Sequence, residues 1–335
     1  MTNESGSSAL STPPRTADAE PTDAPGTPAA DETAPSATAI GALWLGILAL
    51  VWLTVMLRSV QASLTSPGDG AFGITAAAIG LPAVVSAALV GGAGVALAVR
   101  GFVRRSLDER PTARFVIALG SGLLVGMGAA AAIVLGHPDG GSAVMVLGGT
   151  IAAGATIGAA LAGIRATAVV GAGVAASLGV FLLTFLRELF KSDLLRIFGA
   201  GDNPVSMLNA QHWLGLTGAV LSGLVAGLIA VAYLRRAVRH AAAPPRWPVY
   251  LLAGASTGLM LLLTEAITRI GGAQVLALAR SVSDHDSVFQ DMADAARINA
   301  GLLVLFVGGI TAIIAFGRTL TPAAADEPAE EPATP

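Results

Sequence analysis

Eight long apolar stretches, separated by short polar breaks, dominate this sequence between residues 40 and 316. Each is close to the roughly 20 residues that a helix needs to cross a bilayer. A helix also satisfies its own backbone hydrogen bonds, which lipid cannot do. The pattern predicts an all-α, polytopic membrane helix bundle. The eight transmembrane helices are predicted at residues 40–57, 74–99, 115–135, 143–164, 168–186, 214–234, 249–267 and 301–316.

The composition favours the same class of protein. Only 12% of the residues are charged, whereas a soluble domain has roughly 25%. No basic face suited to nucleic acid remains, so we exclude nucleic-acid binding. The chain has no cysteine, which excludes disulfides, thiolate metal sites and a cysteine nucleophile. Arginine far outnumbers lysine, and alanine and glycine are abundant, which is typical of a GC-rich bacterial genome.

Both ends of the chain are poor in large apolar residues. Residues 1–38 and 319–335 are rich in Ala, Pro, Thr and acidic residues and bury too little apolar surface to fold. We expect two disordered acidic tails around a transmembrane domain at residues 39–318. No basic segment precedes the first apolar stretch, so the N-terminal tail is not expected to be a secretory signal.

The loops differ in charge according to their position. Arginines lie in the loops after the second, fourth and sixth predicted spans, and Arg318 follows the eighth. Short loops rich in Lys and Arg favour the cytoplasm. The sequence therefore predicts a multi-pass protein of the bacterial cytoplasmic membrane with both termini in the cytoplasm.

Two segments between predicted spans, both on the outer side, have amphipathic patterns. Residues 186–198 alternate Leu, Ile and Phe with charged residues at three- and four-residue intervals, as in a helix at a membrane surface. Residues 288–297 have an apolar and a polar face and are expected to extend the eighth span as a helix. Together these outer amphipathic helices would form an outer cap.

Glu265 is the most informative candidate site residue, because a carboxylate within a span is costly and often functional. Arg269 lies four residues later on the same face, so the two side chains can form an ordinary structural ion pair. Alternatively, Glu265 binds a proton, a cation or a cationic headgroup at the outer mouth of a cavity formed with Arg58, Arg187 and Glu188. Both interpretations remain open at this point.

Three spans end in a similar way. Thr54, Thr184 and Thr264 are each followed by an arginine about one turn later. One interpretation is a repeated helical hairpin, since duplicated units are common in transporters. The other is that a threonine bonds back to its helix and an arginine extends to the headgroups at any outer end.

Small residues spaced by four recur in several spans and allow two helix backbones to approach closely. One pair surrounds Ser256, with the spacing of a serine nucleophile motif, but such a nucleophile needs a base within hydrogen-bond reach. All four histidines lie in or beside loops, so we expect the motif to serve helix packing. The pairs are Gly122 and Gly126, Gly154 and Gly158, Gly223 and Gly227, and Gly254 and Gly258.

No cofactor or metal site is predicted. The run Asp284-His285-Asp286 contains possible ligands for a divalent ion, and His285 is also a possible pH switch. Adjacent residues of an extended loop point in alternate directions, however, so a solvated loop is the simpler interpretation.

The sequence favours a transporter, or a subunit of a transport complex, that handles a lipid or another apolar solute. Glu265, near the outer end of its span, is the single carboxylate within the predicted spans, whereas transporters of polar solutes usually carry more intramembrane charge. The alternative is a non-catalytic scaffold or accessory protein for envelope assembly, with protein partners at the outer cap or a cytoplasmic tail. A lipid-modifying enzyme is the third interpretation. Membrane lipids are the expected partners in each case.

Overall fold

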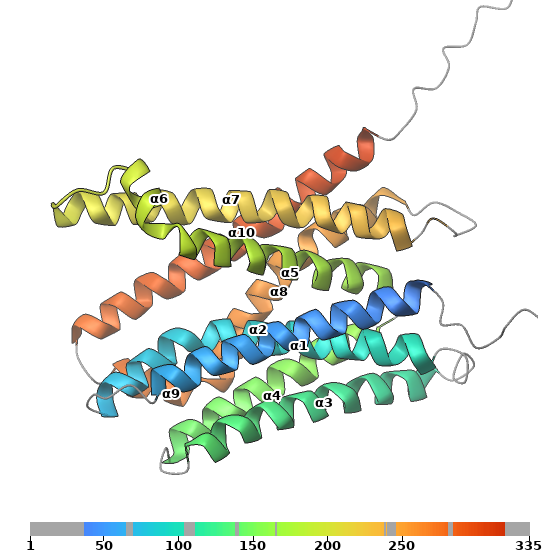
Figure 1. Cartoon of the computed structure of the whole chain (residues 1–335), viewed down its shortest axis with the longest axis horizontal. Coiled ribbons are helices and arrows are strands. Elements are labelled where there is room, and N and C mark those ends of the chain that lie inside the picture. Colours follow the sequence, from blue (N-terminus) through green and yellow to red (C-terminus); the bar gives the residue numbers. More distant parts are fainter. Residues whose placement is uncertain are drawn as a thin grey trace, which may run out of the picture. The chain divides into compact units, whose positions relative to one another are not determined.

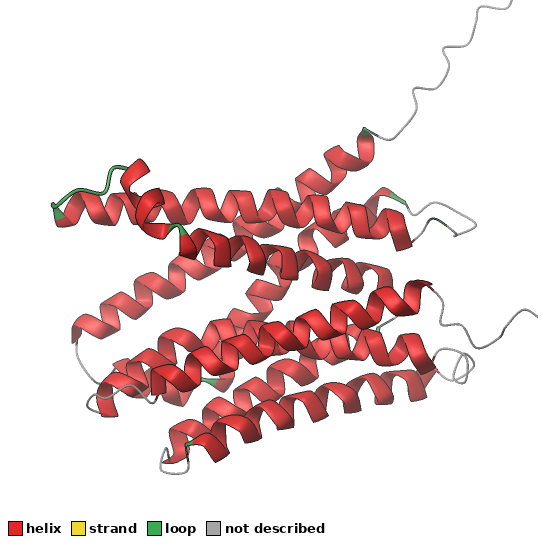
Figure 2. Cartoon of the chain, in the orientation of Figure 1, coloured by secondary structure: helices red, strands yellow, loops and turns green. Residues whose placement is uncertain are grey.

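The computed structural model describes residues 37–64, 70–103, 111–137, 141–164, 166–237, 239, 246–280 and 284–318. The predicted tails lie outside these residues, except where α1 begins. All regular elements in the described residues are helices (Figures 1 and 2). They are α1 (Ala37–Leu64), α2 (Gly70–Val103), α3 (Pro111–Gly136), α4 (Gly141–Gly163), α5 (Thr167–Leu189), α6 (Lys191–Ile197), α7 (Pro204–Ala237), α8 (Trp247–Gly271), α9 (Ala273–Arg280) and α10 (Asp284–Gly317).

Eight of these helices are long and apolar enough to cross a membrane, which confirms the predicted all-α, polytopic bundle. They are α1 to α5, α7, α8 and α10, whereas α6 and α9 are short. Large apolar side chains cover the outside of the bundle, as Leu124 and Leu135 show with exposures of 75% and 80%. In water such a surface would aggregate, but in a bilayer it contacts the lipid chains.

The first four helices form one unit, and they supply most of a packed core that also includes Val174 of α5 and Met260 and Ile267 of α8. α2 is central and contacts α1, α3 and α4. Glycines permit these close contacts: a β-carbon on Gly92 would overlap the carbonyl of Ala155 in α4, and one on Gly158 would overlap the carbonyl of Leu89 in α2. The paired small residues therefore pack helix against helix, as the sequence predicts.

The helices α5, α7, α8 and α10 form a second unit around another core. Here α7 is central and contacts α5, α8 and α10. The pattern of helix neighbours matches that of the first unit when α5, α7, α8 and α10 are paired with α1, α2, α3 and α4 in order. Each unit crosses the membrane four times, so both units begin at the same end of the bundle.

Close contacts occur at matching positions in the two units. Gly227 of α7 lies against the carbonyl of Gly308 in α10, as Gly92 lies against Ala155. The glycine pair of α3, Gly122 and Gly126, packs on α4, and the pair of α8 packs on α10 in the same order. The motif around Ser256 is thus a packing motif of the second unit.

Sequence identities follow the same correspondence. When α2 is aligned with α7, Gly80-Leu81 matches Gly215-Leu216, Gly92 matches Gly227 and Arg100 matches Arg235. The repeated element is therefore a unit of four spans. Of the three similar helix ends noted in the sequence, those of α1 and α5 take matching places in the two units, whereas the end of α8 does not.

Several contacts join the units, and they include packing of α8 on α2 and α4 and of α5 on α1 and α2. Trp52 of α1 stacks on Phe181 of α5, with ring centroids 4.5 Å apart. At the far end of α8, the short helix α9 packs Val275, Leu276 and Ala279 against Ala78 of α2. α9 therefore belongs to the second unit in sequence but also packs on the first.

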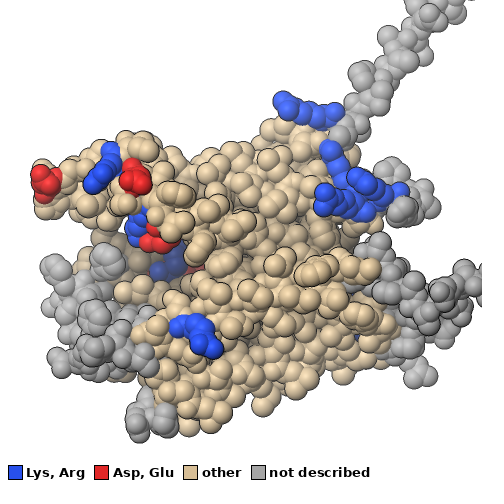
Figure 3. All heavy atoms as spheres, in the orientation of Figure 1, with Lys and Arg blue, Asp and Glu red and all other residues tan. Residues whose placement is uncertain are grey.

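The two ends of the bundle differ in charge. The beginning of α1 and the end of α10 lie at one end, and α6 and α9 lie at the other (Figure 1). On the face shown in Figure 3, basic side chains gather without acidic ones where α7 ends, and charges of both signs mix around α6. We call these the basic end and the mixed end. Described residues at the basic end carry Arg100, Arg114, Arg235, Arg236, Arg239, Arg246 and Arg318 and no acidic residue.

The segments at the mixed end differ in part from the prediction. Residues 186–198 are not one helix, because α5 continues to Leu189 and a turn at Phe190 precedes α6. The predicted extension at residues 288–297 is confirmed as part of the continuous helix α10. The short helix α9 was not predicted. In the turn between α6 and α7, Gly199 has a φ of 83°, and the side chain of Asn203 accepts a hydrogen bond from the backbone of Val205.

Candidate functional site

Glu265 lies near the mixed end of α8 and is 5% exposed. Its Oε1 accepts a hydrogen bond from Nε of Arg269 at 2.9 Å, which confirms the predicted pair within one helix. Its Oε2 accepts a hydrogen bond from Nε of Arg297 in α10 at 3.1 Å. Two guanidinium groups thus bind one buried carboxylate, and the second contact joins α8 to α10.

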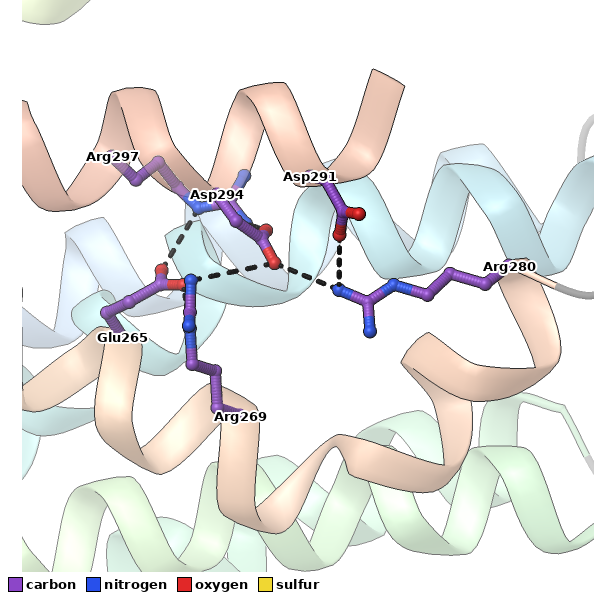
Figure 4. A network of polar contacts seen from close by, with 6 residues as sticks. All are labelled: Glu265, Arg269, Arg280, Asp291, Asp294 and Arg297. Atoms are coloured by element: carbon purple, nitrogen blue, oxygen red, sulfur yellow. Dashed lines mark hydrogen bonds and ion pairs between the residues drawn. The ribbon is translucent and has the colours of Figure 1, made fainter. Parts of the chain in front are cut away.

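A second buried carboxylate, Asp294 of α10, extends the contacts of Glu265 (Figure 4). Asp294 pairs with Arg297 one turn later, with Arg269 at 3.7 Å and with Arg280 of α9 at 3.3 Å. Arg280 also pairs with Asp291 at 3.0 Å. These six residues form a charge network of three acids and three arginines. Its formal charge is zero, which lowers the cost of keeping it near the apolar core.

The order of the helices explains how the network forms. α8 ends at Gly271, and the backbone N–H of Gly272 bonds to the carbonyl of Thr268. α9 then turns the chain so that Arg280 faces the start of α10. Antiparallel packing of α8 and α10 brings Glu265 opposite Arg297, and Arg269 opposite Asp294.

The two faces at the start of α10 lie opposite to the usual arrangement in a soluble protein. Gln290 and Asp294 are buried at 6% exposure, whereas Val288 and Met292 are more than half exposed. Polar side chains inside and apolar ones outside are expected where a helix end contacts lipid and its polar face binds charged partners. The Oε1 and Nε2 atoms of Gln290 are buried and have no hydrogen-bond partner in the described part of the chain.

The other predicted site residues do not join this network. Glu188 pairs with Lys191 at 2.6 Å across the turn between α5 and α6, and both side chains are largely exposed. Arg58 is exposed on α1. Within the described residues, neither these side chains nor Arg187 contacts Glu265. The described partners of Glu265 lie on α8 and α10, so the cavity combining it with Arg58, Arg187 and Glu188 remains a prediction.

Arg187 instead lines a groove between α5 and α7. The groove has a volume of about 290 Å³ and is open on one side. The guanidinium lies directly against Gly218 of α7, where any β-carbon would overlap it. The described residues provide no carboxylate partner for Arg187. The groove is lined by Leu183, Thr184, Leu186, Arg187, Phe190, Leu194, Gly218, Leu221 and Ser222.

The described residues show neither a metal-ligand cluster nor a base paired with Ser256. No group of three or more His, Asp and Glu side chains in them is arranged to hold a metal ion. The side chains of Asp284-His285-Asp286 lie outside the described set, although their backbone begins α10. The hydroxyl of Ser256 donates to the carbonyl of Ala253 in its own helix, so it shows no pairing with a base.

Comparison with known proteins gives no relative for this chain. No protein-family model, curated protein or solved structure matches it.

The sequence predicted part of the site. It identified Glu265, Arg269 and Arg187, but it did not link Arg297, Asp294 or Arg280 to Glu265. The spacing of Asp294 and Arg297 is a visible signal for a pair within one helix. The contact between Arg297 and Glu265 spans two helices and depends on tertiary packing.

Proposed function

We propose that this protein is a transporter, or a subunit of a transport complex, that moves a lipid or another apolar solute. The observation that carries the proposal is the pair of similar four-helix units that run in the same direction. Parallel repeats recur in membrane transporters, where movement of one repeat against the other changes access to the substrate. Here the units meet where α8 packs on α2 and α4 and where the rings of Trp52 and Phe181 stack.

An apolar substrate agrees with the distribution of charge. The buried carboxylates Glu265 and Asp294 are each bound by arginines, so neither offers a free charge to a polar solute. The groove beside Arg187 is mostly apolar, and two of its lining residues, Leu186 and Leu221, are exposed and would contact lipid. A substrate that arrives from the membrane suits this geometry better than one that arrives from water.

The charge difference between the ends supports an orientation. The basic end has seven described arginines, named above, and no described acidic residue. Short basic loops favour the cytoplasm, so we place that end, and with it both termini, in the cytoplasm of a bacterial cell. The mixed end, with α6, α9, the charge network and the groove, then faces outward.

A scaffold for envelope assembly is the second candidate, and α6 favours it. None of its residues is buried, and Ile197 and the neighbouring Leu189 are 77% and 66% exposed. An exposed apolar surface on an outer segment suits either a membrane surface or a protein partner. A scaffold would need this surface and would not require the two units to move.

A thiol cross-link between the two units separates these candidates. The chain has no cysteine, so Trp52→Cys with Phe181→Cys creates the only thiols, at positions whose rings touch. Proteoliposomes containing a fluorescent phospholipid analogue would be assayed before and after treatment with a short bifunctional thiol reagent. A transporter should transfer the lipid only without the cross-link. Transfer that is unchanged by complete cross-linking, or absent with folded wild-type protein, would favour the scaffold.

A further inference from the structure

We infer that the groove between α5 and α7 binds one anionic phospholipid. Its phosphate lies on Arg187, and the part of an acyl chain nearest the headgroup lies between the two helices. The inference deepens the proposed lipid transport and rests on it for the role of the bound lipid.

The charge of Arg187 has no protein counterion in the described residues. Its neighbour Glu188 is bound by Lys191 at 2.6 Å, and the described acids of the charge network bind other arginines. Arg187 itself is half-buried among Leu and Phe side chains. A guanidinium in apolar surroundings is unfavourable without an anion. A phosphate, which arginine binds with two parallel hydrogen bonds, is a suitable partner.

The depth of Arg187 matches that of a lipid phosphate. The residue lies in the last turn of α5, at the end of the span Thr167–Leu189. Leu183 and Leu221 lie further into the membrane, and Phe190 and Leu194 enclose the groove from the turn and α6. A ligand with its charge on Arg187 would therefore place apolar atoms deeper in the bundle. Phospholipids have this arrangement, whereas a free phosphate has no apolar part to fill the groove.

Gly218 makes room for the guanidinium. A β-carbon at this position would overlap Arg187, and the matching position of α2 in the first unit is Ala83. Arg58 of α1, near the position that corresponds to Arg187, is exposed. The site is consequently a feature of the second unit alone, which predicts one bound lipid per chain.

The test measures lipid preference in the full-length protein. Wild-type protein would be placed in nanodiscs containing equal amounts of phosphatidylglycerol and phosphatidylcholine, and the lipids retained after extraction would be counted by native mass spectrometry. We expect one phosphatidylglycerol to be retained preferentially. Arg187→Gln should reduce the preference about tenfold, equivalent to about 1.4 kcal/mol, and Arg187→Lys should restore part of it. Arg58→Gln is the matched control and should leave the preference unchanged.

Gly218→Ala provides a second variant in case Arg187→Gln does not fold. It keeps the charge and should displace only the flexible end of Arg187, so it should weaken the preference. Retained preference in the folded Arg187→Gln or Gly218→Ala protein would overturn the site, and so would an equal loss in Arg58→Gln. Displacement of the lipid by equimolar glycerol phosphate would also overturn it, because the acyl chain would then contribute nothing. Transport that persists without this preference would leave the proposed function standing.

Discussion

Arg100 and Arg235 take the same position in the two four-helix units and bond to the same place on the fourth helix. Arg100 of α2 donates to the carbonyl of Ala162 in α4 and, at 3.1 Å, to that of Ile164. Arg235 of α7 donates to the carbonyl of Ala315 in α10 at 2.8 Å. Ala162 and Ala315 both lie about two turns beyond the contact made by Gly92 or Gly227. The repeat therefore includes a specific polar contact as well as helix order.

These arginines should stabilise their own units independently. A hydrogen bond from a guanidinium to a carbonyl at the C-terminal end of a helix satisfies an acceptor that the helix leaves open. Arg235→Ala should lower the free energy of unfolding by about 1 kcal/mol, and Arg100→Ala by at least as much, since two bonds are lost. The double variant should show the sum of the two effects, measured by denaturant unfolding in detergent. Arg236→Ala, an exposed neighbour, should have little effect, and an equal loss there would contradict the assignment.

The contacts between helix backbones give a second prediction. Gly227→Ala would bring a β-carbon to 2.6 Å from the carbonyl of Gly308, and overpacking of this kind costs about 1–3 kcal/mol. Gly215 lies in the same helix and has open space around it, so Gly215→Ala should be neutral or slightly stabilising because alanine favours helix. Thermal unfolding of the two variants in the same detergent tests the difference. Equal melting temperatures would argue against close packing of α7 on α10.

The sequence was sufficient to predict the membrane class and the eight spans, because hydrophobic length depends only on local composition. It did not predict α9. The segment at Ala273–Arg280 is only eight residues long, which is too short for a stable isolated helix. Its helical state therefore depends on tertiary contacts, such as those of its apolar side chains with α2. The four-helix repeat was also missed, since matched positions such as Gly92 and Gly227 lie among many other small residues.

The candidate site was predicted only as far as contacts within one helix. Glu265 and Arg269 are four residues apart, and their pairing follows from helix geometry. The bond from Arg297 to Glu265 joins residues 32 positions apart, and no local pattern specifies it. Arg187 and Gly218 likewise meet because α5 packs on α7.

Loss of the Glu265 charge should lower the stability of the protein, and its effect on transport should follow from that loss of stability. Glu265→Gln leaves Arg269 and Arg297 with Asp294 as their one shared carboxylate, and breaking a buried ion pair costs up to about 3–5 kcal/mol. The exposed pair of Glu188 and Lys191 provides a control, because Glu188→Gln should cost no more than about 1 kcal/mol. Unfolding by denaturant in detergent measures both. If Glu265→Gln abolished transport without loss of stability, Glu265 would have a direct functional role.

The two ends of the bundle should label from opposite sides of the membrane. Asp202 is exposed at the mixed end, and Arg239 is exposed at the basic end. Because the natural chain has no cysteine, a single cysteine at either position would be the only target for a thiol reagent that does not cross membranes. In intact spheroplasts, Asp202→Cys should react at once, and Arg239→Cys should react only after the membrane is opened, since basic loops stay in the cytoplasm. Labelling of both from the same side would exclude an odd number of crossings between them, and with it the assignment of α7 as a membrane span. Labelling of Arg239→Cys alone in intact cells would keep the spans but reverse the orientation, and the groove beside Arg187 would then face the inner leaflet.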